Sequence, residues 1–190
     1  ADERRLTRFK FEARAAATLH HPHIVPVFSV GQDEGIHYFA MQFIDGCSLA
    51  EVIDRIHESS RSESQVAGPG EPVGNRSEIS RLTTDSRRND KLAYLRTVVR
   101  WITEAADALS FAHHNGVLHR DIKPGNLMVD SQGKVWVTDF GLARLSIDDS
   151  ITASGELVGT VRYMSPEQAF VRKMPIDHRT DIYSLGATLY

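Results

Sequence analysis

Two short stretches of the sequence concentrate charged and amide side chains. The first runs His119-Arg120-Asp121-Ile122-Lys123-Pro124-Gly125-Asn126, and the second is Asp139-Phe140-Gly141, which follows a hydrophobic segment. Mg²⁺ prefers hard oxygen ligands, which Asp139 and the amide oxygen of Asn126 can supply. Asp121 can accept the proton of a hydroxyl nucleophile, and Lys123 can reach the oxygens of a transferring phosphate. Phosphoryl transfer depends mainly on positioning and charge neutralisation, so this small set of groups suffices.

Each tripeptide, HRD or DFG, is a weak signal alone, but the offsets of Lys123 and Asn126 after Asp121 make chance a poor explanation. The combination resembles the protein serine/threonine kinase family, in its bacterial, eukaryotic-like form. The resemblance implies ATP and Mg²⁺ as cofactors and a protein with Ser or Thr hydroxyls as substrate. It also implies that Asp121, Lys123 and Asn126 act in catalysis, and that Asn126 and Asp139 hold Mg²⁺. The position of Lys123 is similar to the Ser/Thr pattern rather than the tyrosine-kinase one.

The same resemblance implies a set of nucleotide contacts. Glu12 matches the carboxylate that pairs with the family's ATP-binding lysine, and Met41 borders the adenine pocket. The backbone of Phe43 and Ile44 meets the adenine edge, and Met128 forms part of the pocket floor. Ordinary core packing remains the alternative for both methionines, and a solvated helical side chain remains the alternative for Glu12.

The positions of two arginines predict a regulatory loop. This loop lies between Asp139-Phe140-Gly141 and the segment that ends at Glu167. A phosphate on this loop can bridge Arg120 and Arg144, and Thr152 and Ser154 are favoured over Ser150 as its acceptors. Solvated loop hydroxyls are the plainer interpretation. By resemblance, Thr160 bonds near Asp121 and Lys123.

Four further roles are implied by the resemblance. His119 is structural, Phe140 packs beneath the first helix, and Asp181 holds the backbone of the catalytic loop. Glu167 makes a buried ion pair with a residue beyond position 190.

Periodicity and turn residues predict the elements that position these groups. We expect helices over residues 2–18, from a Ser48 cap to about His57, over a long segment that ends at Gly116, and over 177–190. The long helix should bury one side, made of Leu92, Leu95, Val99, Ile102, Ala106 and Leu109. We expect strands at 24–30 and 36–43, joined through 31–35, and at 117–118, 127–129 and 135–138.

The expected fold is α+β and bilobal, resembling an incomplete protein kinase. Residues 1–44 would form a partial small lobe, and residues 45–190 a truncated, mainly helical large lobe. Residues 59–90 are rich in Ser, Gly, Pro and Arg, which predicts a mobile insertion within the large lobe.

Composition limits the classes of function. The chain has 190 residues and a net charge of −3, which argues against bulk nucleic-acid binding. No apolar run is long enough to span a membrane, and a single cysteine, Cys47, fits a reducing compartment. We therefore expect a cytoplasmic domain, whose parent protein can still be tethered to a membrane elsewhere. His20, His21 and His23 cluster, but they lack zinc-type ligand spacing.

Two alternatives to a protein kinase remain open: a pseudokinase that binds partners without catalysis, and a phosphotransferase for small molecules. No Gly-rich loop and no strand lysine precede Glu12 in this chain. The family needs both for ATP, so we expect the isolated 190 residues to have little kinase activity.

Overall fold

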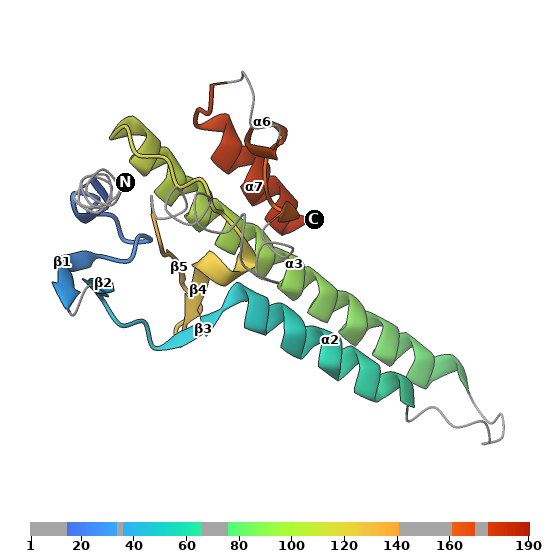
Figure 1. Cartoon of the computed structure of the whole chain (residues 1–190). Helices are drawn as coiled ribbons and strands as arrows, with labels where there is room; N and C mark the ends of the chain where they lie inside the picture. The colour runs from blue at the N-terminus through green and yellow to red at the C-terminus, as the bar shows by residue number, and fades with distance from the viewer. Residues whose placement is uncertain (1–14, 34–35, 66–75, 141–160, 170–174) are drawn as a thin grey trace.

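The computed structural model describes residues 15–33, 36–65, 76–140, 161–169 and 175–190 (Figure 1). A two-stranded sheet and a three-stranded sheet combine with several helices, so the predicted α+β class is confirmed. Residues 15–17, the described end of the predicted first helix, are helical. None of the described helices combines the length and the apolar character of a membrane span.

The two-stranded sheet is an antiparallel hairpin. It comprises β1, Val27–Asp33, and β2, Ile36–Met41, with Asp33 opposite Ile36 at its tip. The predicted hairpin is present, but part of its predicted loop belongs to β1. Gly31 leaves room for the ring of Tyr38 on the opposite strand, since a Cβ atom there would lie 2.3 Å from Cζ of Tyr38. Ile24, predicted as the first residue of that strand, instead bridges Val137 in parallel.

The three-stranded sheet has the order β3-β4-β5 and is antiparallel. Its strands are Gly46–Ser48, Leu127–Asp130 and Val135–Val137. The backbones of β3 and β4 approach closely at Gly46, where a Cβ atom would lie 2.0 Å from the Val129 carbonyl oxygen. This contact fixes β3, which directly follows the connection from β2, onto the hairpin of β4 and β5.

The predicted strand at 117–118 is wrong. The backbone N–H of Val117 bonds to the end of the preceding helix and not to a neighbouring strand. Helix α3, Arg76–His114, is terminated by Gly116 two residues later, whose φ angle is 73°. The Gly116 N–H donates to the His113 carbonyl at 3.0 Å, and the Val117 N–H donates to the Ala112 carbonyl at 2.9 Å. This pair of bonds is a Schellman motif, for which glycine in the left-handed region is the usual residue. Gly116 thus ends the helix as predicted.

Helix α2, Leu49–Gln65, begins at the predicted cap. The Glu51 N–H donates to Oγ of Ser48 at 3.2 Å, and the Ser48 N–H donates to Oε2 of Glu51 at 3.3 Å. The two bonds form a capping box, which satisfies two backbone donors at the helix start.

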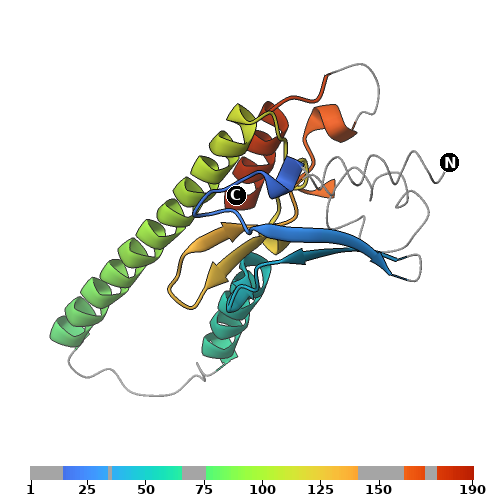
Figure 2. The same ribbon diagram turned by 90° about the vertical axis from the view of Figure 1, so that its left-hand side faces the viewer.

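The structure differs from the expected mobile insertion over most of residues 59–90. Residues 59–65 continue α2, and residues 76–90 begin α3, whereas 66–75 lie outside the described residues. Every Gly and Pro of this stretch falls within 66–75, so the flanking sequences carry no strong helix breaker. Figure 2 shows that α2 and α3 diverge toward this segment. The lobe boundary at residue 44 stays a prediction.

The buried side of α3 differs from the predicted one. Leu109 is buried and Ile102 is partly buried, but Leu92, Leu95, Val99 and Ala106 are exposed, Val99 to 62%. The core contacts instead come from Ala105, Ala108, Leu109 and Ala112. Alanine has no long side chain, so this stripe lets β5 and helix α7, Arg179–Leu189, approach α3 closely. A count of large aliphatic residues misses such a stripe.

Candidate active site

Asp121 lies at the centre of a compact loop that follows α3. The loop ends in a single 3₁₀ turn, η1, Pro124–Asn126, and leads directly into β4. Nζ of Lys123 lies 2.9 Å from Oδ2 of Asp121, and the Asn126 amide donates to the same oxygen at 3.1 Å. The structure therefore brings together the three predicted catalytic side chains, with a cation and an amide on one carboxylate oxygen.

The contacts of Asn126 fix the direction of its side chain. Its amide nitrogen also donates to the Asp121 carbonyl at 2.7 Å, and only 8% of the residue is exposed. With the nitrogen bound to Asp121, the amide oxygen is the atom available to a metal ion. An oxygen ligand of this kind suits Mg²⁺.

Asp139 follows the end of β5, on the opposite arm of the β4–β5 hairpin. Its Oδ2 accepts a hydrogen bond from the Thr138 hydroxyl at 3.1 Å, and the Thr138 N–H donates to the Asn126 carbonyl at 3.0 Å. Thr138 thus joins the two predicted metal ligands through its backbone and its side chain. The donor set of Asn126 and Asp139 fits Mg²⁺, whose role would be to neutralise charge on phosphate oxygens.

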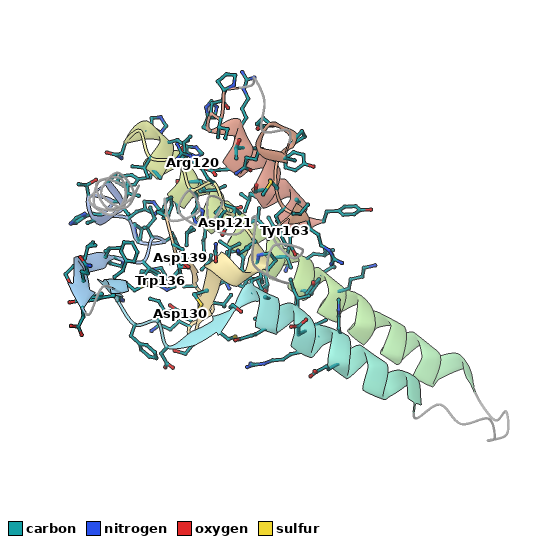
Figure 3. All side chains as sticks on the ribbon, in the orientation of Figure 1. Arg120, Asp121, Asp130, Trp136, Asp139 and Tyr163 are labelled. Atoms are coloured by element: carbon teal, nitrogen blue, oxygen red, sulfur yellow. The ribbon has the colours of Figure 1, made fainter. Side chains whose placement is uncertain are left out.

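Two residues of the site adopt the left-handed backbone region. The φ angle is 69° at Arg120 and 61° at Asp139, which non-glycine residues rarely adopt. Backbone strain of this kind concentrates at functional sites, where surrounding bonds hold it in place. Figure 3 shows the side chains of Arg120, Asp121 and Asp139.

His119 joins the loop of Asp121 to the segment of Asp139. The side chain is fully buried, and its Nε2–H donates to the Thr138 carbonyl at 2.7 Å. Nδ1 accepts a hydrogen bond from the Asp121 N–H at 3.3 Å. Both ring nitrogens therefore have hydrogen-bond partners when the imidazole is neutral. Burial lowers the pKa of His119, and the nearby carboxylate of Asp181 opposes that shift only in part. The position supports the predicted structural role.

Asp181 binds the backbone of the same loop. Its carboxylate is completely buried in the first turn of α7 and accepts the backbone N–H groups of His119 at 2.9 Å and Arg120 at 2.6 Å. The ring of His113 also donates to it at 2.8 Å. Burial alone raises the pKa of Asp181, but the hydrogen bonds from His113 and the loop outweigh it and lower the pKa below its ordinary value. The predicted role of Asp181 is confirmed by these bonds.

We expect the stability of the protein to fall on mild acidification because of His119. Its folded pKa lies below the ordinary value of 6.5, so the unfolded chain binds a proton first as the pH falls. The stabilisation that comes from neutral, buried His119 is complete above pH 6.5 and is lost as the pH falls below it. The free energy of unfolding then falls with a slope that approaches about 1.4 kcal/mol per pH unit. Urea unfolding of wild type and His119→Gln between pH 7.5 and 5.5 measures this slope. Equal slopes for the two proteins would contradict the assignment.

Helix α6, Pro166–Ala169, adds a second set of contacts to the loop. The Gln168 amide donates to the Arg120 carbonyl at 2.8 Å, and Thr180 donates to Oε1 of Glu167 at 2.8 Å. The pKa of Glu167 is lowered by its own backbone N–H and then by the Thr180 hydroxyl. The predicted ion pair of Glu167 involves a residue outside the described ones and stays a prediction.

Of the four predicted nucleotide contacts that the structure describes, three lie at the end of β2 and in the connection to β3, and the fourth lies on β4. Met41 ends β2, Phe43 is 86% exposed, Ile44 is buried, and Met128 lies on β4 opposite Ser48. Exposure of the Phe43 side chain agrees with a contact through its backbone.

Met41, Asp139 and Phe140 line one small cavity, together with Ala16 of the first helix. The structure thereby brings an adenine-pocket candidate to the same cavity as a metal-ligand candidate. Phe140 and Ala16, at the described end of the first helix, belong to the same core cluster.

Several predicted site residues lie outside the described part of the chain. These are Glu12, Arg144, Thr152, Ser154 and Thr160. Their roles remain predictions, as does the phosphate bridge from Arg144 to Arg120.

Several described histidines bond to backbone or carboxylate groups, among them His23, His113 and His114. No three His, Cys, Asp or Glu side chains among the described residues are grouped to hold a metal ion. Of the two histidines at the end of α3, His113 donates to Asp181 at 2.8 Å. His114 is exposed and bonds to the Ser110 carbonyl at 2.7 Å.

Sequence reasoning missed Thr138, Gln168 and His113 as parts of the site. Gln168 and His113 each act through one hydrogen bond to a group that is distant in sequence, the Arg120 carbonyl and the Asp181 carboxylate. No local pattern marks such a bond. The position of Thr138 next to Asp139 was the one signal available.

The comparisons with known proteins agree with this geometry. The family described as the protein kinase domain matches residues 1–190. A probable serine/threonine-protein kinase of Clostridium acetobutylicum is 35% identical over 189 residues, covering 100% of this chain and 23% of the relative. The serine/threonine-protein kinase PknB of Mycobacterium tuberculosis is 34% identical, covering 96% of this chain and 24% of the relative.

Solved structures lead to the same family. The crystal structure of the M. tuberculosis PknI kinase domain has a TM-score of 0.60 and is 28% identical, covering 100% of this chain and 55% of that one. The chain spans about a quarter of the length of the curated relatives it matches, and about half of the solved kinase domain. The resemblance to protein kinases and the partial kinase-like fold are both confirmed. The chain belongs to the protein kinase family.

Proposed function

We infer that this chain is the central part of a protein serine/threonine kinase domain. The protein that contains it would transfer the terminal phosphoryl group of ATP to Ser or Thr hydroxyls of a protein substrate. One observation supports this most: Lys123 and Asn126 both bind Oδ2 of Asp121. The family match over the whole chain supports the same function.

The described residues suggest a division of labour. Asp121 would orient the substrate hydroxyl and accept its proton, since a positioned carboxylate can act as a general base. Lys123 would place its positive charge beside the transferring phosphate. The Asn126 amide oxygen and the Asp139 carboxylate would hold Mg²⁺, and Met41, Phe43, Ile44 and Met128 would border the adenine.

The finer features follow from the family and from its bacterial relatives. ATP and Mg²⁺ are the cofactors we propose, and phosphorylation at Thr152 or Ser154 is the proposed regulation. A bacterial setting fits the organisms of the relatives. A cytoplasmic setting fits the free thiol of Cys47, with a parent protein that can still be tethered to a membrane elsewhere.

The proposal is tested by phosphorylation of a generic basic protein by the whole protein that contains this chain. We expect turnover that requires ATP, that modifies Ser or Thr, and that is lost when EDTA removes the divalent cation and restored by Mg²⁺. The loss follows because the two phosphate-facing oxygen ligands would have no cation to hold. ATP binding without any transfer would favour a pseudokinase instead, and transfer to small molecules alone would also contradict the proposal.

A further inference from the structure

Strand β5 is paired along both of its edges. One edge forms the ladder with β4, and the other faces the segment at residues 23–25. On that second edge the Val137 N–H donates to the His23 carbonyl at 2.8 Å, and the Val25 N–H donates to the Val137 carbonyl at 3.0 Å. Backbone pairing therefore satisfies Val137 and leaves the groups of Val135, one pleat earlier, to other partners.

Side chains complete the edge at Val135. Its N–H donates to Oε2 of Glu104 at 2.9 Å, and its carbonyl accepts a bond from Nδ1 of His23 at 2.9 Å. The same His23 nitrogen lies 3.8 Å from Oε2 of Glu104. Val135 is 1% exposed, so an unpaired N–H there would be costly. The Glu104 carboxylate therefore accepts the hydrogen bond that a neighbouring strand would accept at this edge of β5.

Helix α3 also bonds to the turn that precedes β5. The Gly133 carbonyl accepts bonds from Nε1 of Trp101 at 2.8 Å and from Nη2 of Arg100 at 3.0 Å. Glu104 lies one turn further along the same helix. The start of β5 is thus held to α3 by side chains on consecutive helical turns.

The far end of this strand carries the candidate metal ligand. Thr138 and Asp139 follow Val137 directly, and the Thr138 N–H is bonded to the Asn126 carbonyl. A shift of β5 relative to α3 would therefore displace Asp139 directly, and it would reach Asn126 through the bond from the Thr138 N–H. Residues that orient metal ligands through a second layer of bonds commonly change metal affinity 10- to 100-fold.

We propose that Glu104 is a positioning residue for the metal site, acting through the Val135 N–H and β5. It joins three elements: α3, the segment after the first helix, and the hairpin that carries Asn126 and Asp139. The inference rests on the proposed function, because metal binding by Asp139 is part of that proposal. It assigns Glu104 no contact with ATP, substrate or metal.

Three variants of the whole protein separate this role from a contribution to stability alone. Glu104→Ala removes the acceptor, whereas Glu104→Gln removes the charge and keeps a carbonyl that can accept the Val135 N–H. Thr103→Ala is the matched control, because this exposed neighbour bonds only within its own helix, to the Val99 carbonyl at 2.7 Å. Should Glu104→Ala fail to fold, Glu104→Asp replaces it, since the shorter side chain also loses the contact.

The first measurement needs no activity. Hydrogen exchange of the peptide that covers residues 134–139, without nucleotide or Mg²⁺, should be at least about tenfold faster in Glu104→Ala. Exchange in Glu104→Gln and in Thr103→Ala should stay close to wild type. Unchanged exchange in Glu104→Ala, or equal acceleration in Glu104→Gln, would overturn the proposal.

The second measurement is the dependence of phosphotransfer on Mg²⁺ concentration. The half-saturating Mg²⁺ concentration should rise about tenfold in Glu104→Ala and recover in Glu104→Gln. A loss of kcat with an unchanged Mg²⁺ requirement would indicate a structural role only and would overturn the inference. An inactive wild-type protein would instead contradict the proposed function, while the exchange result would still test the link from Glu104 to β5.

Discussion

Replacing Asp121 by Asn should reduce kcat by roughly 10²- to 10⁴-fold, the range that a positioned general base contributes. Asn has almost the same shape but cannot accept the proton of a substrate hydroxyl. Its amide also gives a weaker partner to Nζ of Lys123, which lies 2.9 Å from the carboxylate in the wild type. The measurement is single-turnover phosphotransfer at saturating ATP, by the whole protein that contains this chain.

The control for Asp121→Asn is Asp107→Asn, on α3. Its side chain is 70% exposed and lies beside His21, outside the proposed catalytic groups. We expect this variant to keep kcat within about twofold of wild type, as most surface substitutions have small effects. An Asp121→Asn protein that binds ATP, unfolds at the wild-type temperature and keeps more than a tenth of kcat would show that Asp121 is not the base.

Replacing Asp181 by Ala should lower the free energy of unfolding by at least about 3 kcal/mol, because each buried donor left without an acceptor costs about 1–3 kcal/mol. The substitution leaves the His113 ring and the N–H groups of His119 and Arg120 without their acceptor. Equilibrium urea unfolding at neutral pH measures the loss. Phosphotransfer should fall too, because Asp181 holds Arg120 in its left-handed conformation next to Asp121.

Asp54→Ala provides the comparison for Asp181→Ala. Asp54 is exposed on α2, so its loss should change the unfolding free energy by no more than about 0.5 kcal/mol. Asp181→Asn keeps the volume of the side chain, yet it turns one acceptor into a donor that faces other donors. We expect it to be destabilised too. Equal stability of Asp181→Ala and wild type would contradict the role given to this carboxylate.

The sequence predicted which residues of the candidate site lie together better than it predicted the contacts that support them. Asp121, Lys123 and Asn126 lie within six residues, and a loop of that length must keep them close. The link to Asp139 could be predicted because a short hairpin, with the turn at Asp130, joins the two arms. Motifs confined to one turn or one hairpin can be recognised in this way from the sequence alone.

The supporting contacts could not be predicted, because they join residues far apart in the sequence. The bond between Gln168 and the Arg120 carbonyl spans 48 positions, and the bond between Glu104 and Val135 spans 31. Both depend on how helices pack against the loop and the sheet. The buried side of α3 was misassigned for a related reason, since alanines can bury a helix as well as leucines do.

The central claim is that Asn126 and Asp139 bind the metal ion beside Asp121. Its most direct test is a crystal structure of the whole protein with Mn²⁺ and a non-hydrolysable ATP analogue, in which anomalous scattering locates the metal. The account predicts a peak bound by the Asn126 amide oxygen and an Asp139 carboxylate oxygen, next to the terminal phosphate. A metal bound elsewhere, or a nucleotide bound without any metal at these two residues, would contradict it.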